Sequence, residues 1–486
     1  MSNTTTEKKI DVMYWVHTVI TLVLMFGIGY LEPWGELEPV GMKVLGIFIG
    51  LLWGWTTIGF VWPSLMGVCA LGLSGYQTTL QVLAAGFGAA NNTVLCVFLF
   101  IFAAYMDKIG LSRIIANWFI SRKICIGRPY VLVLMIFIAA YVLGATISLF
   151  TAILLLYSIF YNVCDTLGYK KQEKFAVVVL CGIVYSAMLG FALFPFKAVQ
   201  IMVLGSLENV SGGLTVGFGS FTVLTFIITV VCLALYMLIM KFIVRPDVSK
   251  FDGIGDIFEE LRHTTMSGEQ KLAGIFLIIF MFAMFAPSVL PANWFITKFF
   301  KALGIPGSLA FVLALMGIVR IGNKEFFNLA DCAKSGMNWD MIIMFVATMP
   351  VSAAMSNSEI GVVNFLVSLV DPIFSHFSGL AFAAMFLLVC GLLTQVAHNL
   401  VLAAMLTPIM YQFCIQLGAD PLMMAVLFSF AIATAVATPG GSATAALMFT
   451  NDWIGRKNSY IYGWLMAIIS IIVVIVVGIP VGSIIF

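Results

Sequence analysis

The segment MLGFALFPFKAVQIMVLG, residues 188–205, decides the fold because it reads as a membrane span interrupted in its middle. It is apolar almost throughout, yet Pro195 removes a backbone N–H donor there, and the cation Lys197 follows closely. A second apolar stretch, TAVATPGGSAT at 434–444, is broken by Pro439 and two glycines. Unwound backbone and half-helix ends bind ions and anions inside membranes, so the two breaks mark a candidate binding site.

The composition around these segments is that of a polytopic membrane protein. Of 486 residues, 62% are hydrophobic and 9% are charged, and the mean hydropathy is +1.10. A span needs roughly 20 apolar residues, and the sequence offers about eleven such stretches plus two apolar hairpins. In lipid only helices or closed barrels satisfy their own backbone, and no barrel pattern is present, so we expect an all-α fold. Nucleic acid is not expected as a partner.

The basic residues predict how the chain is oriented. With a cytoplasmic N-terminus, 20 of the 24 Lys and Arg residues fall in cytoplasmic segments, and the opposite loops are mostly acidic. Besides Lys8 and Lys9, these segments are 108–128, 170–174, 241–271, 320–334 and 456–457. The prediction is a multi-pass protein of the cell membrane, with an extracytoplasmic C-terminus and an uncleaved first span.

Two pairs of similar stretches indicate an internal repeat. YSIFYNVCDTLG at 157–168 matches TPIMYQFCIQLG at 407–418, and at nearly the same offset KIGLSRIIANWF at 108–119 matches EIGVVNFLVSLV at 359–370. In the predicted topology the members of the second pair lie on opposite sides of the membrane. The repeats are therefore expected to be inverted, as in many secondary transporters.

The repeat divides the chain into four parts: a first transmembrane helix at 1–40, repeats at 41–244 and 272–486, and a cytoplasmic linker at 245–271. Each repeat holds an uncharged apolar stretch too long for one span, which we expect to be a re-entrant hairpin, followed by a broken helix. The hairpins are 129–163 and 379–413, and the broken helices are 175–205 and 421–450.

These motifs resemble the divalent anion:sodium symporters, secondary transporters of dicarboxylates, citrate or sulfate. The likeness runs from GMKVLGIFIGLLWGWTTIGFVWPSLMGVCALGLSGY at 41–76 to YGWLMAIISIIVVIVVG at 462–478. In that family each hairpin tip carries a Ser-Asn-Thr motif and each broken helix a Thr-Pro turn. The resemblance implies a homodimer in the lipid bilayer, with a scaffold domain and a transport domain that moves as an elevator.

The second copy of these motifs is well kept. GLLTQVAHNLVLAAMLTPI at 391–409 is similar to the family's second hairpin tip, with Asn399 at the asparagine position, and VATPGG at 436–441 to its partner turn. The resemblance implies one Na⁺ site, formed by Thr394, Ala397, Asn399, Ala437 and Pro439. Its implied substrate contacts are Ser148, Lys197, His398, Asn399, Thr438 and Pro439. His398 and Leu400 depart from the motif, replacing serine and threonine.

The first copy is degraded. Ser148 is kept, but Leu149 and Phe150 replace the asparagine and threonine, and neither side chain can ligate a cation. In the partner turn Phe194 replaces threonine, and Lys197 stands at a glycine position. The hypothesis is that the Lys197 ammonium supplies the fixed positive charge that a first sodium ion would otherwise bring.

Simpler explanations stay open for several of these residues. The Lys197 side chain could simply extend along the helix so that its ammonium lies at the membrane interface. His398 would also fit a residue that only begins a helix, and the threonines would fit bonds to their own helices. Asp107, near a span end, is expected to be interfacial, which leaves His398 as the only plausible proton carrier.

The leading expectation is a secondary transporter of small organic anions, carboxylates and possibly dicarboxylates, coupled to sodium through one site and without an organic cofactor. Because Phe150 and Leu400 remove two hydroxyls, the substrate is expected to be less polar than citrate. The alternatives are a sodium-independent anion exchanger and a proton-coupled carboxylate transporter. An enzyme is not expected, because HExxH, GxSxG and an intramembrane aspartate pair are all absent from the sequence, and broken helices in inverted repeats favour a transporter over a channel.

Overall fold

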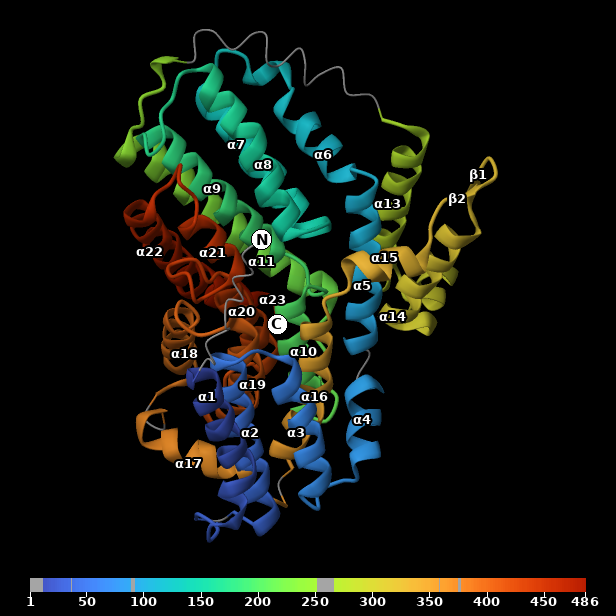
Figure 1. Cartoon of the computed structure of the whole chain (residues 1–486), viewed down its shortest axis with the longest axis vertical. Helices are drawn as coiled ribbons and strands as arrows, with labels where there is room; N and C mark the ends of the chain where they lie inside the picture. Colours follow the sequence, from blue (N-terminus) through green and yellow to red (C-terminus); the bar gives the residue numbers. More distant parts are fainter. Residues whose placement is uncertain (1–11, 36, 89–91, 251–265, 358, 375–376) are drawn as a thin grey trace, which may run out of the picture. The chain divides into compact units, whose positions relative to one another are not determined.

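The computed structural model describes residues 12–35, 37–88, 92–250, 266–357, 359–374 and 377–486, which are almost entirely helical (Figure 1). The chain divides into two compact units, and each is assembled from two separate segments. Residues 1–89 and 339–372 form the first unit, and residues 90–338 and 373–486 form the second. The units thus cut across the two sequence repeats. The inverted relation of the repeats and their boundaries stay predictions.

The first unit is a small helical bundle in which α2 packs on the N-terminal helix and on α3, and α16 packs on α2, α3 and α4. A Cβ at Gly86 of α4 would overlap the Val346 carbonyl of α16, so these two helices touch backbone to backbone. The elements are α1 Val12–Leu22, η1 Val23–Gly27, η2 Ile28–Tyr30, α2 Pro39–Thr57, α3 Val61–Leu73, α4 Thr79–Gly88, α16 Trp339–Met355 and α17 Val362–Phe374, the last two residues of which belong to the second unit.

The second unit contains both predicted hairpins and both predicted broken helices. Its first part comprises α5 Asn92–Lys108, α6 Leu111–Ile120, η4 Lys123–Cys125, α7 Pro129–Thr146, α8 Leu149–Thr166, α9 Lys174–Phe191, α10 Ala198–Val210, α11 Phe218–Ile239 and η5 Met240–Val244. Then come α13 Gly268–Val289, α14 Phe295–Ile318, β1 Arg320–Ile321, β2 Lys324–Glu325 and α15 Leu329–Gly336. The last part comprises α18 Gly379–Leu393, α19 Asn399–Leu417, α20 Pro421–Ala433, α21 Ala443–Phe449, α22 Arg456–Val473, η7 Val474–Gly478 and α23 Ile479–Ile485.

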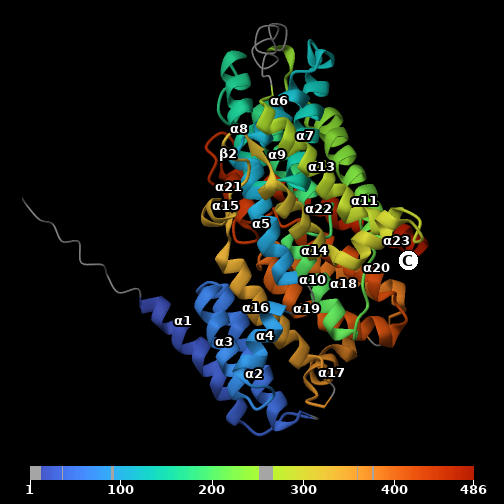
Figure 2. The ribbon, with the colours of Figure 1, turned by 90° about the vertical axis from the view of Figure 1, so that its right-hand side faces the viewer.

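Local sequence explains where several of these helices begin. Ser148, Ser378 and Ser442 accept hydrogen bonds from the first turns of α8, α18 and α21, and Asp420 does the same for α20. Between α5 and α6 the chain turns at Gly110, whose φ of +73° suits glycine. Figure 2 shows α5 running beside α14 and α15, on which it packs.

A common order of elements occurs twice along the chain. Two helices, a bent pair, a short helix, a helical hairpin and a broken helix follow one another from α2 to α10, and again from α13 to α21. Each series ends in a long helix with a π-helical segment, η5 in the first and η7 in the second. The order agrees with the predicted repeat, which stays a prediction.

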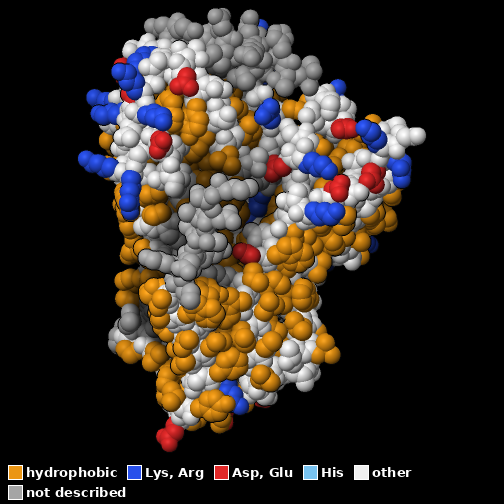
Figure 3. All heavy atoms as spheres, viewed as in Figure 1, with side chains coloured by type: hydrophobic (Ala, Val, Ile, Leu, Met, Phe, Trp, Pro, Cys, Tyr) orange, Lys and Arg blue, Asp and Glu red, His pale blue; other side chains and the backbone are white. Residues whose placement is uncertain are grey.

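Among the described residues, ten helices are long and apolar enough to cross a membrane, or up to twelve if each bent pair counts as one span. On the face shown in Figure 3, hydrophobic side chains cover broad areas of surface. Val223, Phe226 and Val230 on α11 are examples of large apolar side chains that are half or nearly half exposed. These surfaces suit a multi-pass protein whose solvent is lipid.

The start of the predicted linker is anchored to the segment between α8 and α9. Lys250 pairs with Glu173 at 2.9 Å, and the Tyr169 hydroxyl donates to the Asp247 carbonyl at 2.8 Å. The Lys170 backbone N–H, followed by Lys250, holds the pKa of Glu173 below its usual value. Residues 251–265 of the linker and residues 1–11 of the N-terminal segment lie outside the described residues.

Candidate functional site

The second hairpin is joined to its partner turn by Gln395, a buried residue just after α18. Its Oε1 accepts hydrogen bonds from the backbone N–H groups of Val436 and Ala437, at 3.0 and 2.9 Å. Its Nε2 donates to Gly391 at 2.9 Å and to Thr434 at 3.4 Å, in both cases to the carbonyl. One amide therefore satisfies backbone groups of the unwound segment that follows α20, together with one carbonyl of α18.

Carbonyl groups at the end of α18 face the same turn. The Thr438 hydroxyl donates to the Gln395 carbonyl, and the Thr394 hydroxyl donates to the Ile432 carbonyl at 2.9 Å. A Cβ at Gly441 would lie 2.9 Å from the Thr394 carbonyl oxygen and 2.8 Å from that of Gln395. The negative end of a half-helix and several hard oxygen atoms thus meet at one place, which suits a hard cation such as Na⁺.

Asn399 and His398 lie together where α19 begins, both half-buried. The Leu400 N–H donates to Asn399 Oδ1 at 2.9 Å and to His398 Nδ1 at 3.3 Å, so both side chains cap the helix. Ala397 precedes them and is half-buried, whereas Pro439 in the turn is exposed. The structure therefore links Thr394, Ala437 and Thr438 through Gln395, and keeps His398 and Asn399 as a neighbouring pair.

In the first copy Lys197 immediately precedes α10, in the N-cap position. Phe196 lies under the ammonium, with its ring centroid 5.9 Å from Nζ. Three residues on, the buried amide of Gln200 has no hydrogen-bond partner among the described residues. N-cap and N3 side chains lie near each other, so a cation and an unpaired amide share the positive end of this half-helix.

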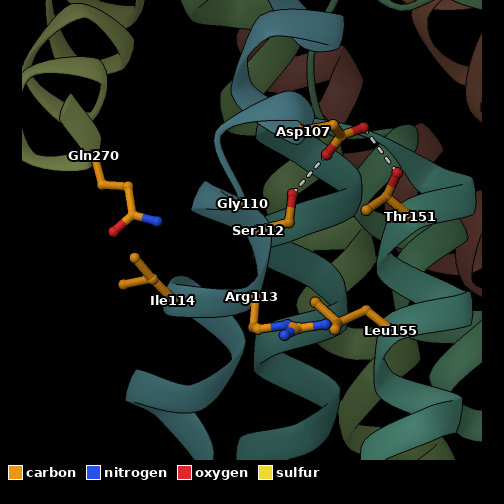
Figure 4. A pocket seen from close by; sticks show the side chains of 8 residues that line it. All are labelled: Asp107, Gly110, Ser112, Arg113, Ile114, Thr151, Leu155 and Gln270. Carbon is orange, nitrogen blue, oxygen red and sulfur yellow. Dashed lines mark hydrogen bonds between the residues drawn. The ribbon is translucent and has the colours of Figure 1, made fainter. Parts of the chain in front are cut away.

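Asp107 connects the first hairpin with the first broken helix. As Figure 4 shows, its carboxylate lies between two hydroxyls: Ser112 donates to Oδ1 at 2.7 Å and Thr151 to Oδ2 at 2.8 Å. Thr151 belongs to the first turn of α8, which Ser148 caps. Asp107 also interacts electrostatically with Lys197, because α5 packs on α10.

The same carboxylate lines a half-open cavity of about 390 Å³. Arg113 and Gln270 contribute the other charged or amide side chains of its lining, and Ile114 and Leu155 contribute apolar ones. Asp107 thus faces the cavity and also interacts with Lys197, which is not part of the lining.

Helices of the two predicted repeats pack on one another inside the second unit. α10 of the first copy packs on α19 and α20 of the second, and α9 packs on α21 and α22. Thr444 on α21 donates to the Met188 sulfur on α9 at 3.6 Å. The two broken helices are therefore neighbours, as a shared binding region requires.

A model of a known family, described as citrate transporter (CitMHS), matches residues 6–428. The chain belongs to this citrate transporter family. An uncharacterized transporter of Haemophilus influenzae is 21% identical over 465 residues, which are 95% of each chain. An uncharacterized transporter of Synechocystis is 28% identical over 126 residues, which are 25% of this chain but only 20% of that protein.

Two solved structures share the fold. The Alcanivorax borkumensis YdaH transporter, described as having an unusual topology, aligns with a TM-score of 0.57 at 14% identity, over 83% of this chain and 87% of that one. Neisseria gonorrhoeae MtrF, described within a class of antimetabolite efflux pumps, aligns with a TM-score of 0.58 at 11% identity, over 97% and 96%. These findings confirm a transporter rather than an enzyme, and a divergent member of the group that the sequence motifs indicated.

Sequence reasoning did not assign three of the residues described above. Gln395 and Gln200 each place an amide in an apolar segment, and the requirement that buried amides find partners was the signal that would have identified them. Asp107 was expected at the interface. Nothing in the sequence connects it with Thr151, because 44 residues separate the two in the chain.

Proposed function

We propose that this member of the citrate transporter family is a sodium-coupled secondary transporter of small carboxylates, possessing one sodium site. Asn399, Ala437 and the carbonyls around Thr394 and Gln395 would hold the ion. Lys197 and Gln200, at the positive end of α10, would receive a substrate carboxylate. The observation that carries the proposal is this pairing of opposite half-helix ends: carbonyls at the end of α18, and an ammonium at the start of α10.

Sodium binding is tested by the thermal stability of the purified protein in sodium, potassium or choline chloride. Wild-type protein is expected to be stabilised by sodium alone, by about 2.7 kcal/mol at a concentration 100 times the Kd. Asn399→Ala is expected to lose the shift, whereas Lys197→Ala is expected to keep it and to lose carboxylate uptake. If sodium and potassium stabilise the wild type equally, sodium coupling is wrong.

The substrate class is tested by uptake into proteoliposomes of labelled succinate, citrate, sulfate, hexanoate and suberate. Ser148 is the only hydroxyl among the three tip positions 148–150, and Phe150 is 46% exposed, so apolar substrate carbons find a matching surface. Suberate or hexanoate is therefore expected to be preferred. Strong transport of citrate alone would contradict this expectation and would indicate that the substrate is the one named in the description of the family.

A second candidate, sodium-independent anion exchange, is favoured by one specific observation. Asp107 gives Lys197 a fixed carboxylate as an electrostatic partner, so this region can approach charge balance without a bound cation. Exchange of suberate that is equally fast in sodium and in choline would favour this candidate.

A further inference from the structure

We infer that Asp107 is the built-in counter-ion of Lys197, which a substrate carboxylate displaces when it binds and which replaces the substrate when it leaves. The inference rests on the proposed function and deepens it. It assigns a role in the transport cycle to a residue that lies on α5, outside the hairpins and the broken helices.

The first step is the environment of Lys197. Lys197 is half-buried, with the Phe196 ring centroid 5.9 Å from its Nζ, and an ammonium in such a place is costly within a membrane protein unless an anion lies nearby. Among the described residues no carboxylate lies within 4.0 Å of it. Asp107 lies at the end of α5, which packs on the α10 helix that Lys197 begins, and it is the acidic group that interacts with Lys197 electrostatically. The positive charge of Lys197 is therefore balanced by Asp107, although the two side chains do not form a close ion pair.

The second step is the way in which Asp107 is held. Each carboxylate oxygen accepts one hydrogen bond from a hydroxyl group, Oδ1 from Ser112 on α6 and Oδ2 from Thr151 on α8. These two bonds do not involve Lys197, so Asp107 stays satisfied when the ammonium turns to another carboxylate. An aspartate that served only as an ion-pair partner would be left without a hydrogen bond at that moment.

The third step is access. Asp107 forms part of the wall of the half-open cavity, and Arg113 on the same wall is exposed and attracts anions. An anion that enters past Arg113 reaches Asp107 (Figure 4). The negative charge of Asp107 in turn balances the positive charge of Lys197. Under the inference, an anion that reaches this wall would compete with Asp107 for the Lys197 ammonium.

The consequence concerns the return of the empty carrier. When the substrate leaves, Asp107 balances Lys197, so the empty site can reorient. In Asp107→Asn the empty site carries an isolated ammonium. With suberate bound, the two substrate carboxylates balance Lys197 and one sodium ion in both proteins, and in the wild type the remaining charge of Asp107 is stabilised by the hydroxyls of Ser112 and Thr151. The variant should therefore catalyse the exchange of external for internal suberate but should not catalyse net uptake of suberate.

The test uses proteoliposomes and labelled suberate, with net uptake into empty vesicles and exchange into suberate-loaded vesicles measured side by side in sodium. For Asp107→Asn the ratio of net uptake to exchange is expected to fall at least tenfold. Asp107→Glu, which keeps the charge, and Asp165→Asn, which removes an exposed carboxylate at the end of α8, should leave the ratio within twofold of wild type.

Equal losses of both rates in Asp107→Asn, with sodium stabilisation intact, would overturn the inference and leave the proposed function standing. Absence of suberate exchange in the wild type would overturn the proposed function as well. If Asp107→Asn does not fold, Thr151→Val decides. It keeps the carboxylate but removes one hydroxyl donor, so the KM for suberate should rise at least threefold, and an unchanged KM would overturn the inference.

Discussion

Gln395 shows how one side chain can hold a broken span together. A helix that unwinds in a membrane exposes backbone groups that no water is present to satisfy. Here the amide of Gln395 accepts from two N–H groups of the turn and donates to the carbonyls of Gly391 in α18 and Thr434 after α20. The break after α20 is therefore stabilised by the hairpin that lies beside it.

Replacing Gln395 by alanine is expected to destabilise this region. Val436 and Ala437 would lose the partner of their N–H groups, and a buried donor without a partner costs about 1–3 kcal/mol. Thermal unfolding should therefore occur at a lower temperature, and the sodium-dependent shift should disappear. Gln412→Ala on α19 is the matched control, because the side chain of Gln412 makes no hydrogen bond with the described part of the chain. Equal effects of the two variants would contradict a specific role for Gln395.

Sequence reasoning worked for residues whose role follows from chemistry alone. Lys197 and Asn399 were singled out because charges and amides in apolar stretches require partners, and both begin helices in the structure. Their identity as site residues stays a prediction. Asp107 and Thr151 were not paired, because a contact between α5 and α8 depends on packing that a linear pattern does not contain.

At the scale of elements, the first hairpin is held against the first broken helix by glycines. A Cβ at Gly144 of α7 would overlap the Ala187 carbonyl of α9, and a Cβ at Gly190 of α9 would overlap the Tyr141 carbonyl of α7. Small residues allow helices to approach this closely within membranes, where packing replaces the hydrophobic effect. The hairpins were predictable from the length of the uncharged stretches, but these reciprocal contacts were not.

Gly144→Ala is expected to destabilise the protein by about 1–3 kcal/mol, because the added methyl group has no space beside a rigid backbone. Gly274→Ala is the matched control on α13, where an added Cβ meets nothing within 4 Å. There alanine should stabilise the helix by up to about 1 kcal/mol. Denaturation of both variants in the same detergent measures the difference, and equal behaviour would refute the tight α7–α9 contact.

At the scale of the whole molecule, composition was enough to predict a helical membrane protein, and the family match and the fold confirm it. The division into units was beyond the sequence pattern. The repeats are consecutive in the chain, whereas each compact unit takes a segment from both. Contacts between residues far apart in the chain decide such a division, and they leave no local signal.

The predicted orientation is tested by cysteine labelling in intact cells. Among the described cysteines all are free and only Cys69 is exposed, so a Cys69→Ser background is suitable. Asn293→Cys, in the exposed loop after α13, should react with an impermeant maleimide from outside. Lys123→Cys, which is exposed near α6, should react only after permeabilisation. The reverse pattern would invert the proposed topology and place the N-terminus outside.

The glycine contacts between α7 and α9 also bear on how this lineage has diverged. They are made by backbone against backbone, so they place no demand on the side chains at the nearby tip. Substitutions at that tip, for example at Leu149 and Phe150, could therefore accumulate without weakening the contact between α7 and α9. Ligand choice and architecture are thereby free to evolve at different rates, in agreement with a fold that this chain shares with two solved transporters at 11–14% identity.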